Sequence, residues 1–346
     1  MTTAILRGFA PLLLLLTSLV SQAQLSNGYD DAMAAFRAKN YEVAARLFAQ
    51  IDSTNPASAD APLFQAKSLV NLRRFPEAEN VLRQYLTLHS DSDDALYLLG
   101  FVLNRENKPA ESLATYTRAA AIKPPTGDDL KIVGLNYVLL NDYEDAIKWL
   151  ERAVQMAPSD KESWYFLGRA YYTRGRLPQA EKAFRTVLQL DPRDAKAENN
   201  LGLLLEAAAK TDDAIKAYRQ AIAWGEQDSH ISEQPYLNLG NLLMEQDHLS
   251  DAIPLLEKAA QIAPNDASCR LKLGTAYLRM NRLPDAQREL QRSTELDPEN
   301  AQAHFQLGRL YKQTHSLDLA KREFDRVEEI QSRAARVSST PTPVRH

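Results

Sequence analysis

The sequence predicts an all-α protein, an α-solenoid built from one helical hairpin that is repeated along the chain. The first observation is a glycine that recurs every 34 residues, with a single longer step of 38 residues. These glycines are Gly100, Gly134, Gly168, Gly202, Gly240, Gly274 and Gly308. The second observation is a small residue with the same spacing, namely Ala44, Ala78, Ser112, Ala146, Ala180, Ala214, Ala252, Ala286 and Ala320. Self-similarity at such a period indicates one supersecondary unit stacked on copies of itself.

Residues 161–192 are the clearest copy and show why the unit is a helical hairpin. The first half places Trp164, Leu167, Gly168 and Tyr171 at positions i, i+3, i+4 and i+7, which is the apolar stripe of an amphipathic helix. The second half has the same kind of stripe, formed by Leu177, Ala180, Phe184, Val187 and Leu190. A hairpin with two apolar inner faces is too small to bury them alone, so its copies must stack.

These residues resemble the tetratricopeptide repeat family, whose W-x2-L-G-x2-Y…A-x3-F…P pattern residues 161–192 match in full. The resemblance implies a right-handed superhelix of about nine hairpins over residues 24–337. The copies begin near Leu25, Ala59, Asp93, Gly127, Lys161, Ala195, Glu233, Ala267 and Ala301. The family pattern is specific for the fold and says little about function.

Three parts of the array depart from the pattern. The first two copies have Ala32 and Ala66 in place of the recurring glycine, as expected near an end where one face meets solvent. The copy that begins at Ala195 lacks the final proline and carries four extra residues within 225–230. We expect a surface insertion there, with a partner contact as the alternative, because longer loops cost little. The last helix runs on through residues 328–337.

Residues 1–23 have the features of a secretory signal peptide. Arg7 precedes a mostly apolar stretch, Phe9 to Val20, and residues 21–23 supply a small-x-small cleavage pattern. The apolar stretch is shorter than the roughly 20 residues of a membrane helix. We therefore expect an exported protein, periplasmic or extracellular, without a stable membrane span after cleavage; an uncleaved anchor is the alternative. The last residues, 338–346, are rich in Pro, Ser and Thr and are expected to be a disordered tail.

Composition and motifs disfavour several classes of function. The formal net charge of −4 gives no support for a nucleic-acid partner, which usually needs a basic face. The single cysteine, Cys269, excludes an intramolecular disulfide. The sequence has no nucleophile elbow, phosphate-binding loop, HExxH motif or Cys/His cluster. We therefore expect no enzyme activity, no cofactor and no metal site.

The resemblance implies that the first helix of each pair lines the inside of the superhelix and contacts ligands there. On residues 161–173 this inner stripe contains Tyr165, Arg169 and Tyr172, set apart from the core stripe. A groove with aromatic anchors and a few polar side chains suits a peptide segment. The expected peptide contacts are Tyr97, Phe101, Lys131, Leu135, Tyr165, Arg169, Tyr172, Asn199 and Asn241. The alternative is that these side chains only pack against the neighbouring first helix.

The carboxylate clamp with which some family members grip acidic chaperone tails is incomplete in this chain. Lys131 could occupy its first lysine position, but Leu135 stands where the resemblance requires asparagine. We therefore expect a non-catalytic, exported scaffold that binds a partner peptide in its concave groove. The alternative is a structural or assembly subunit of an envelope or secretion complex, acting through self-association or its convex face. A third possibility is an accessory subunit whose catalytic partner is another chain.

Overall fold

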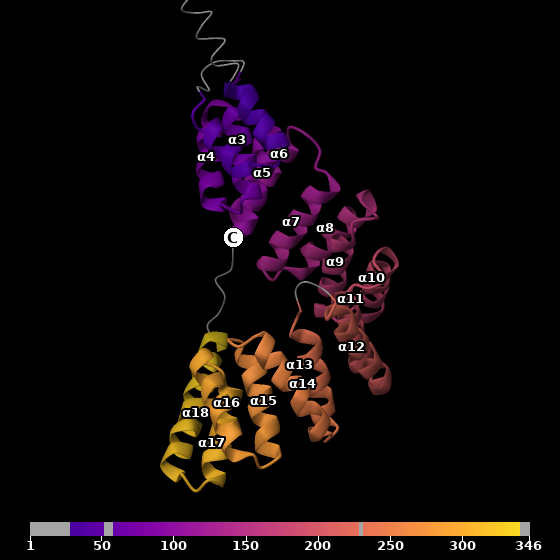
Figure 1. The fold of residues 1–346 in the computed structure, drawn as a ribbon, viewed down its shortest axis with the longest axis vertical. Helices are drawn as coiled ribbons and strands as arrows, with labels where there is room; N and C mark the ends of the chain where they lie inside the picture. Colours follow the sequence, from indigo (N-terminus) through magenta and orange to yellow (C-terminus); the bar gives the residue numbers. More distant parts are fainter. Residues whose placement is uncertain (1–27, 52–57, 228–230, 340–346) are drawn as a thin grey trace, which may run out of the picture. The chain divides into compact units, whose positions relative to one another are not determined.

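The computed structural model describes residues 28–51, 58–227 and 231–339, and these residues form helices and turns without any strand (Figure 1). The chain divides into two units, residues 1–180 and 181–346, each described here by itself. Three predicted features lie wholly or partly outside the described residues: the signal peptide at 1–23, the second half of the 225–230 insertion (residues 228–230) and most of the tail. No described helix combines the length and the apolar composition that crossing a membrane requires.

Unit 1 is a stack of helical hairpins. Residues 28–37 are helical and pair with α2. The following helices are α2 (Tyr41–Phe48), α3 (Ala61–Asn71), α4 (Phe75–Leu88), α5 (Asp93–Arg105), α6 (Pro109–Ala120), α7 (Gly127–Leu139), α8 (Tyr143–Met156) and α9 (Lys161–Thr173). Within the unit α3 packs on α4, α5 on α6 and α7 on α8, and each hairpin also contacts the next. Helix α10 (Leu177–Leu190) contains the boundary between the two units.

Unit 2 repeats the same arrangement. Its helices are α11 (Ala195–Ala207), α12 (Thr211–Gly225), α13 (Gln234–Glu245), α14 (Leu249–Ile262), α15 (Ala267–Arg279), α16 (Leu283–Leu296), α17 (Ala301–Gln313) and α18 (Leu317–Ser339). The pairs are α11 with α12, α13 with α14, α15 with α16 and α17 with α18. The expectation of an all-α solenoid of helical hairpins is confirmed. Helix α18 continues to Ser339, two residues into the segment expected to be disordered.

The recurring glycine lies where the two helices of a hairpin approach most closely. A Cβ atom added at Gly134 would be 2.7 Å from Cγ of Leu150. Such an atom at Gly100 would be 2.6 Å from the ring of Tyr116. These distances are too short for a side chain, so each glycine is required by the packing of its hairpin.

The turn inside each hairpin contains one residue in the left-handed region of backbone conformation. These residues are Lys39, Arg73, Asn107, Asn141, Gly175, Ala209, Asp247, Asn281 and His315, with φ between 56° and 69°. Only Gly175 adopts this conformation without steric cost. The packing of the two helices therefore imposes the turn, and the turn residue tolerates it.

Side-chain caps fix where most of the first helices begin. Ser92, Thr126, Asp194 and Asp266 each accept a hydrogen bond from the backbone N–H three residues later, and Asn300 does the same for α17. At α9 the cap is Asp160, which accepts from the N–H of Glu162. Capping of this kind satisfies backbone donors that have no partner inside the helix.

Candidate functional site

Unit 1 contains a cavity of about 620 Å³ over the first helices α5 and α7. Such a volume is typical of ligand-binding clefts. Four of the nine residues expected to contact a peptide line it: Tyr97, Phe101, Lys131 and Leu135. Side chains from α3, α6, α9 and the α6–α7 loop complete its lining. We refer to this cavity below as the α5–α7 pocket.

The walls of the α5–α7 pocket are aromatic and aliphatic. Tyr97 and Phe101 lie four residues apart on α5, so their side chains occupy the same helix face. The Tyr97 hydroxyl donates a hydrogen bond to the backbone carbonyl of Lys123, at 2.6 Å, which holds its ring in place. From α7, Ile132 and Leu135 supply the aliphatic wall.

A chain of buried hydrogen bonds supports the base of the pocket. The Asn104 amide nitrogen donates to Oδ1 of Asn136 at 2.9 Å, and the Asn136 amide nitrogen donates to Oγ of Ser112 at 2.7 Å. The Ser112 hydroxyl in turn donates to the carbonyl of Gly100 at 2.6 Å. The first of these bonds uses one N–H of the Asn104 amide, whose Oδ1 accepts no hydrogen bond from any described residue.

Tyr116 lines the pocket with a second polar atom that has no protein hydrogen-bond partner among the described residues. The side chain is only 4% exposed, and its ring lies against Gly100 and 5.7 Å from the ring of Tyr97, centroid to centroid. Burial raises the pKa of the Tyr116 phenol, so the group is neutral at physiological pH. Among the described residues its hydroxyl has no hydrogen-bond partner. Neither this hydroxyl nor Asn104 Oδ1 is among the fully enclosed side-chain atoms without a partner in the described residues, so both can be hydrated through the pocket.

The charges at the rim are mostly held in ion pairs. Lys131 contacts Asp128 at 3.2 Å, Asp160 at 3.1 Å and Glu162 at 3.0 Å, and its side chain is 12% exposed. Burial lowers the pKa of Lys131, but the hydrogen bonds to Glu162 and Asp160 outweigh it and raise the pKa overall. Three carboxylates already surround the ammonium group of Lys131, so this side chain links α7 to the start of α9 and is not free to contact a ligand.

Arg105 differs from the other cations of the rim. Lys67 pairs with Asp94 at 3.4 Å and Lys123 with Asp93 at 2.9 Å. Arg105 is exposed, and no described carboxylate pairs with it; its guanidinium lies 5.7 Å from the centroid of the Phe75 ring. The rim therefore carries one positive charge that is available to a ligand.

The other five predicted contact residues lie outside the α5–α7 pocket. Tyr165, Arg169 and Tyr172 follow one another along α9, where Arg169 is exposed and the two tyrosines are half-buried. In unit 2, Asn199 is only 6% exposed and accepts a hydrogen bond from the Asn238 amide at 3.0 Å, so it joins α11 to α13. Asn241 donates to Glu245 at 2.8 Å, and its own Oδ1 is buried without a partner. The nine residues thus do not form one site.

The expected contacts omit Asn104, Arg105 and Tyr116, which also line the pocket. Tyr116 has a core position of the repeat, Asn104 has the same variable position as Tyr172, and Arg105 lies at the end of its helix. One sequence signal could have found the base of the pocket. Ser112 replaces the recurring alanine, and a polar residue in a core position needs a polar neighbour.

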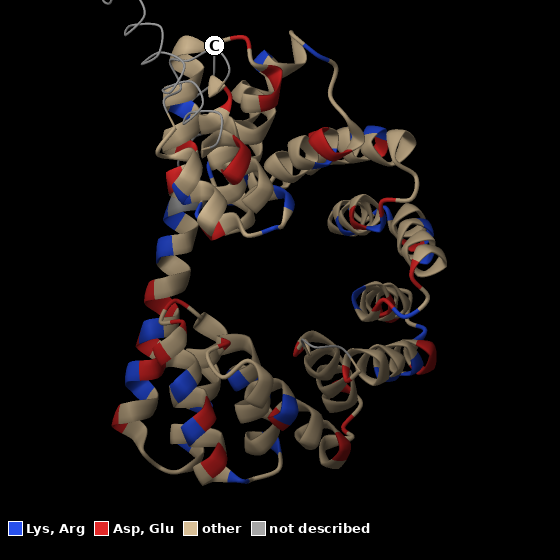
Figure 2. Ribbon diagram, turned by 45° about the horizontal axis from the view of Figure 1, so that its top comes forward, with Lys and Arg blue, Asp and Glu red and all other residues tan. Residues whose placement is uncertain are grey.

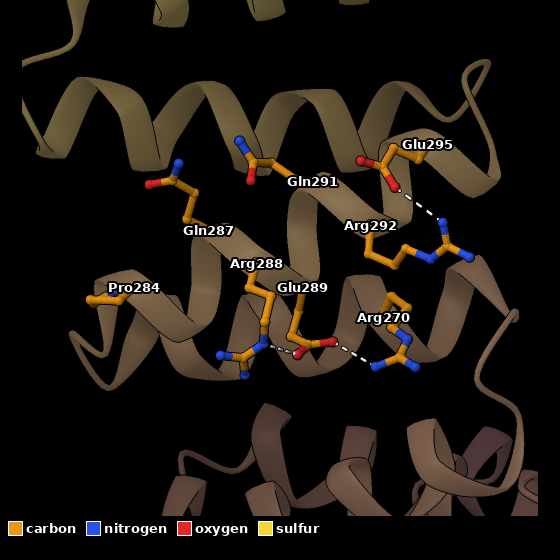
Figure 3. Close-up of a pocket in the computed structure, with 8 residues that line it drawn as sticks. All are labelled: Arg270, Pro284, Gln287, Arg288, Glu289, Gln291, Arg292 and Glu295. Carbon is orange, nitrogen blue, oxygen red and sulfur yellow. Dashed lines mark hydrogen bonds and ion pairs between the residues drawn. The ribbon is translucent and has the colours of Figure 1, made fainter.

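A second cavity, of about 590 Å³, lies over α16 in unit 2 and has a different character (Figure 3). Glu289, whose side chain is 7% exposed, lies between Arg270 and Arg288, each 2.8 Å away. The remaining arginine of this cavity, Arg292, pairs with Glu295 at 3.1 Å. Three arginines and two glutamates line this cavity, and each of these charged side chains takes part in an ion pair, so the cavity offers no free charge.

Charged residues of both signs are spread over the described residues of both units. Lys and Arg positions are interspersed with Asp and Glu positions along the helices of both units (Figure 2). In the part of the chain that the structure describes, no group of three or more His, Cys, Asp or Glu side chains is placed to hold a metal ion.

Solved structures resemble this chain in fold. A tetratricopeptide repeat protein from Parabacteroides merdae is 17% identical, with a TM-score of 0.59 over 72% of this chain and 97% of that one. A chain of the APC/C hetero-tetramer Cut9-Hcn1 is 17% identical, with a TM-score of 0.60 over 78% of this chain. The match spans 52%, about half, of that longer chain. PilF of Pseudomonas aeruginosa is 20% identical, with a TM-score of 0.52 over 60% of this chain and 97% of PilF.

Sequence comparison with families is more decisive than these structural likenesses. No curated protein matches the chain. A model of the tetratricopeptide repeat matches residues 63–125, 134–195, 167–230 and 271–335, and a second model of the same repeat matches residues 243–296. These matches cover more than half of the sequence and agree with the helical hairpins of both units. The chain belongs to the tetratricopeptide repeat family.

Proposed function

We propose that this protein is a non-catalytic interaction scaffold that binds a peptide segment of a partner protein in the α5–α7 pocket. Tetratricopeptide repeat proteins generally act as scaffolds that bind proteins or peptides. The observation that carries the proposal is the pocket itself, whose walls contain Tyr97, Phe101 and Leu135 and whose base has two unpaired polar atoms. Apolar anchors with a few polar groups are the usual means of holding a peptide.

Charge favours a protein partner over a nucleic acid. Nucleic-acid binding requires a basic face, whereas this chain has a formal net charge of −4 and mixed charges along its helices (Figure 2). The rim of the α5–α7 pocket likewise has both signs, with Arg105 as its available cation. A peptide backbone and side chains can use such a mixed rim for hydrogen bonds.

A pair of matched substitutions tests the site. Peptides would be selected on the unaltered protein from a phage-displayed random library and their Kd values measured by calorimetry. Leu135→Arg places a charge in the pocket wall and should weaken binding at least about tenfold, the effect of roughly 1.4 kcal/mol. Leu203→Arg is the control, because Leu203 has the same repeat position on α11 and is also partly buried.

The results of this test separate the alternatives. Loss of binding in Leu135→Arg with little change in Leu203→Arg supports the site. Equal binding by both variants and the unaltered protein would refute the α5–α7 pocket as the peptide site, and failure to select any peptide would contradict peptide binding altogether.

Export is a further part of the proposal and rests on the features of residues 1–23. The mature protein would then begin at Gln24 and reside in the periplasm or outside the cell. Intact-mass measurement of the protein recovered from its native host would test this. A mass that still includes residues 1–23 would favour the uncleaved anchor.

An assembly role is the second candidate, and the last hairpin favours it. Leu317 and Leu319 on α18 are 66% and 40% exposed, and two similar structures belong to PilF and to PilW, the latter a type IV pilus biogenesis factor. Exposed apolar residues at the end of a solenoid suit a further protein surface. Light scattering of the purified protein, with Leu317→Asp as the comparison, would reveal self-association; a monomer at all concentrations would oppose it.

A further inference from the structure

The two unpaired polar atoms at the base of the α5–α7 pocket restrict what can occupy it. Asn104 Oδ1 is an acceptor, and the Tyr116 hydroxyl can donate or accept. Both belong to side chains that are at least nine-tenths buried, Asn104 at 9% and Tyr116 at 4% exposure. An occupant that expels water from this base must replace the lost hydrogen bonds, or it binds weakly.

The walls restrict the occupant in a second way. Three aromatic rings, those of Tyr97, Phe101 and Tyr116, face the same cavity as Ile132 and Leu135. Aromatic rings gain most from another ring placed at their edge or offset over their face. The body of the preferred occupant is therefore aromatic.

The charges of the lining disfavour an ionised occupant. Four cations and four carboxylates line the cavity, namely Lys67, Arg105, Lys123 and Lys131 with Asp94, Asp128, Asp129 and Glu162. A cationic side chain would meet the uncompensated Arg105, and a carboxylate at the base would face the Asn104 carbonyl oxygen. A neutral group avoids both repulsions.

From these observations we infer that the α5–α7 pocket recognises an aromatic side chain that carries one hydrogen-bond donor, the phenol of a tyrosine or the indole of a tryptophan, on the partner peptide. The ring lies among Tyr97, Phe101 and Leu135, and its O–H or N–H donates to Asn104 Oδ1. The Tyr116 hydroxyl contributes a second hydrogen bond to a phenol. The inference rests on the proposed peptide binding and specifies its anchor residue.

Unit 2 contains a matched control. Tyr218 has the repeat position of Tyr116, and its ring lies against Gly202 as that of Tyr116 lies against Gly100. Unlike Tyr116, the Tyr218 hydroxyl donates to Oε2 of Glu206 at 2.7 Å. Removing the Tyr218 hydroxyl should therefore perturb helix packing as much as removing the Tyr116 hydroxyl does. It should not affect the binding of a ligand in the α5–α7 pocket.

The test uses small side-chain analogues, because the partner is unidentified. The Kd values of p-cresol, 3-methylindole and toluene would be measured by NMR titration on protein purified from cells that express the full sequence. The unaltered protein should bind p-cresol and 3-methylindole about fivefold or more tightly than toluene, the contribution of about one hydrogen bond. Leu135→Trp places a larger side chain in the pocket and should weaken the binding of all three analogues, which would show that they bind in the α5–α7 pocket.

Tyr116→Phe removes only the hydroxyl and keeps the ring on Gly100. It should raise the Kd of p-cresol about fivefold and leave the Kd of toluene unchanged, whereas Tyr218→Phe should change neither Kd. Equal Kd values for p-cresol and toluene on the unaltered protein would overturn the inference. The inference would also be overturned if Tyr116→Phe still bound p-cresol more tightly than toluene. The same holds if Tyr218→Phe reduced this preference as much as Tyr116→Phe does.

The inference and the proposed function can fail separately. If selected peptides lose affinity in Leu135→Arg but p-cresol and toluene bind equally, the peptide site stands and the anchor is wrong. If the three analogues behave as expected but no peptide can be selected, the pocket chemistry stands and peptide binding fails.

Discussion

Two hairpins of this protein, α5–α6 in unit 1 and α11–α12 in unit 2, have the same packing. Gly100 lies against the ring of Tyr116, and Gly202 lies against the ring of Tyr218. A Cβ atom added at either glycine would be within 2.6 Å of the tyrosine ring. The repeated residues therefore build the same close contact in both places.

The two hairpins differ in the residue that lies beside the tyrosine hydroxyl. In α11 it is Glu206, which accepts the hydrogen bond from Tyr218. The corresponding residue of α5 is Asn104, whose amide instead donates to Asn136 of the next hairpin. As a result Tyr116 keeps an unpaired hydroxyl at the base of a cavity. The repeated positions therefore fix the fold, whereas the variable polar positions decide where a binding site can form.

Overpacking the shared glycine has the largest expected effect and tests the similarity of the two hairpins. Gly100→Leu and Gly202→Leu should each lower the free energy of unfolding by about 1–3 kcal/mol, because the new side chain meets a tyrosine ring. Urea denaturation followed by circular dichroism measures this effect. Gly28→Leu is the control, since nothing lies within 4 Å of a Cβ added there. A stable Gly100→Leu protein would contradict the assigned packing.

Exchanging the polar residues tests the difference between the hairpins. Asn104→Glu gives Tyr116 the acceptor that Tyr218 has, so the pocket should lose its preference for p-cresol over toluene, about a fivefold change. The reverse change, Glu206→Asn, should leave the α5–α7 pocket unaffected. NMR titration of the two analogues measures both. A preference that persists in Asn104→Glu would show that the unpaired hydroxyl plays no part.

The turns of the same two hairpins differ as well. Asn107 and Ala209 both have positive φ, 59° and 56°, but asparagine tolerates this conformation better than alanine. Ala209→Gly should therefore stabilise the protein by about 1 kcal/mol, and Asn107→Gly should change it less. Thermal unfolding of the two variants provides the comparison. Equal effects of both substitutions would contradict the idea that alanine is more strained than asparagine in this turn.

The smallest expected effect concerns acid stability at the pocket rim. Burial would raise the pKa of Asp160, but the hydrogen bonds from Ser163 and Lys131 outweigh it and lower the pKa. Because the folded pKa is below the unfolded one, this stabilisation is present above the unfolded pKa of about 3.9 and is lost as the pH falls below it. Lys131→Met should reduce the dependence of the free energy of unfolding on pH, by less than about 1 kcal/mol.

Asn199 supplies the matched control for that measurement. It has the repeat position of Lys131 on α11, where it forms a neutral hydrogen bond with Asn238. The free energy of unfolding, measured by urea denaturation, should therefore change less between pH 7 and pH 3 in Lys131→Met than in Asn199→Ala. If the two variants show the same dependence on pH, the ion pairs of Lys131 do not set it.

The fold could be predicted because its determinants repeat. Gly134 and Ala146 are constrained by contacts inside one hairpin, so their spacing alone predicts the hairpin and its stacking. The same spacing predicted ligand contacts at Phe101 and Leu135, and both residues line the α5–α7 pocket. The family model matches then confirm the repeat over most of the chain.

The details of the site could not be predicted, because they depend on side chains about 30 residues apart in the sequence. The repeat pattern predicts a ligand contact at Lys131 but does not show that Asp160 and Glu162 of the next hairpin surround its ammonium group. Asn199 is likewise buried by the following hairpin. Only the structure shows that Asn104 points its amide at Asn136 and leaves Tyr116 unpaired.

Hydrogen exchange with a selected peptide bound tests the central claim most directly, because it reports which part of the chain the peptide contacts. The amides of α5 and α7 should become protected on binding, and those of α11 and α13 should exchange as they do in the free protein. Protection confined to α11 and α13, or none in α5 and α7, would contradict the α5–α7 pocket as the binding site.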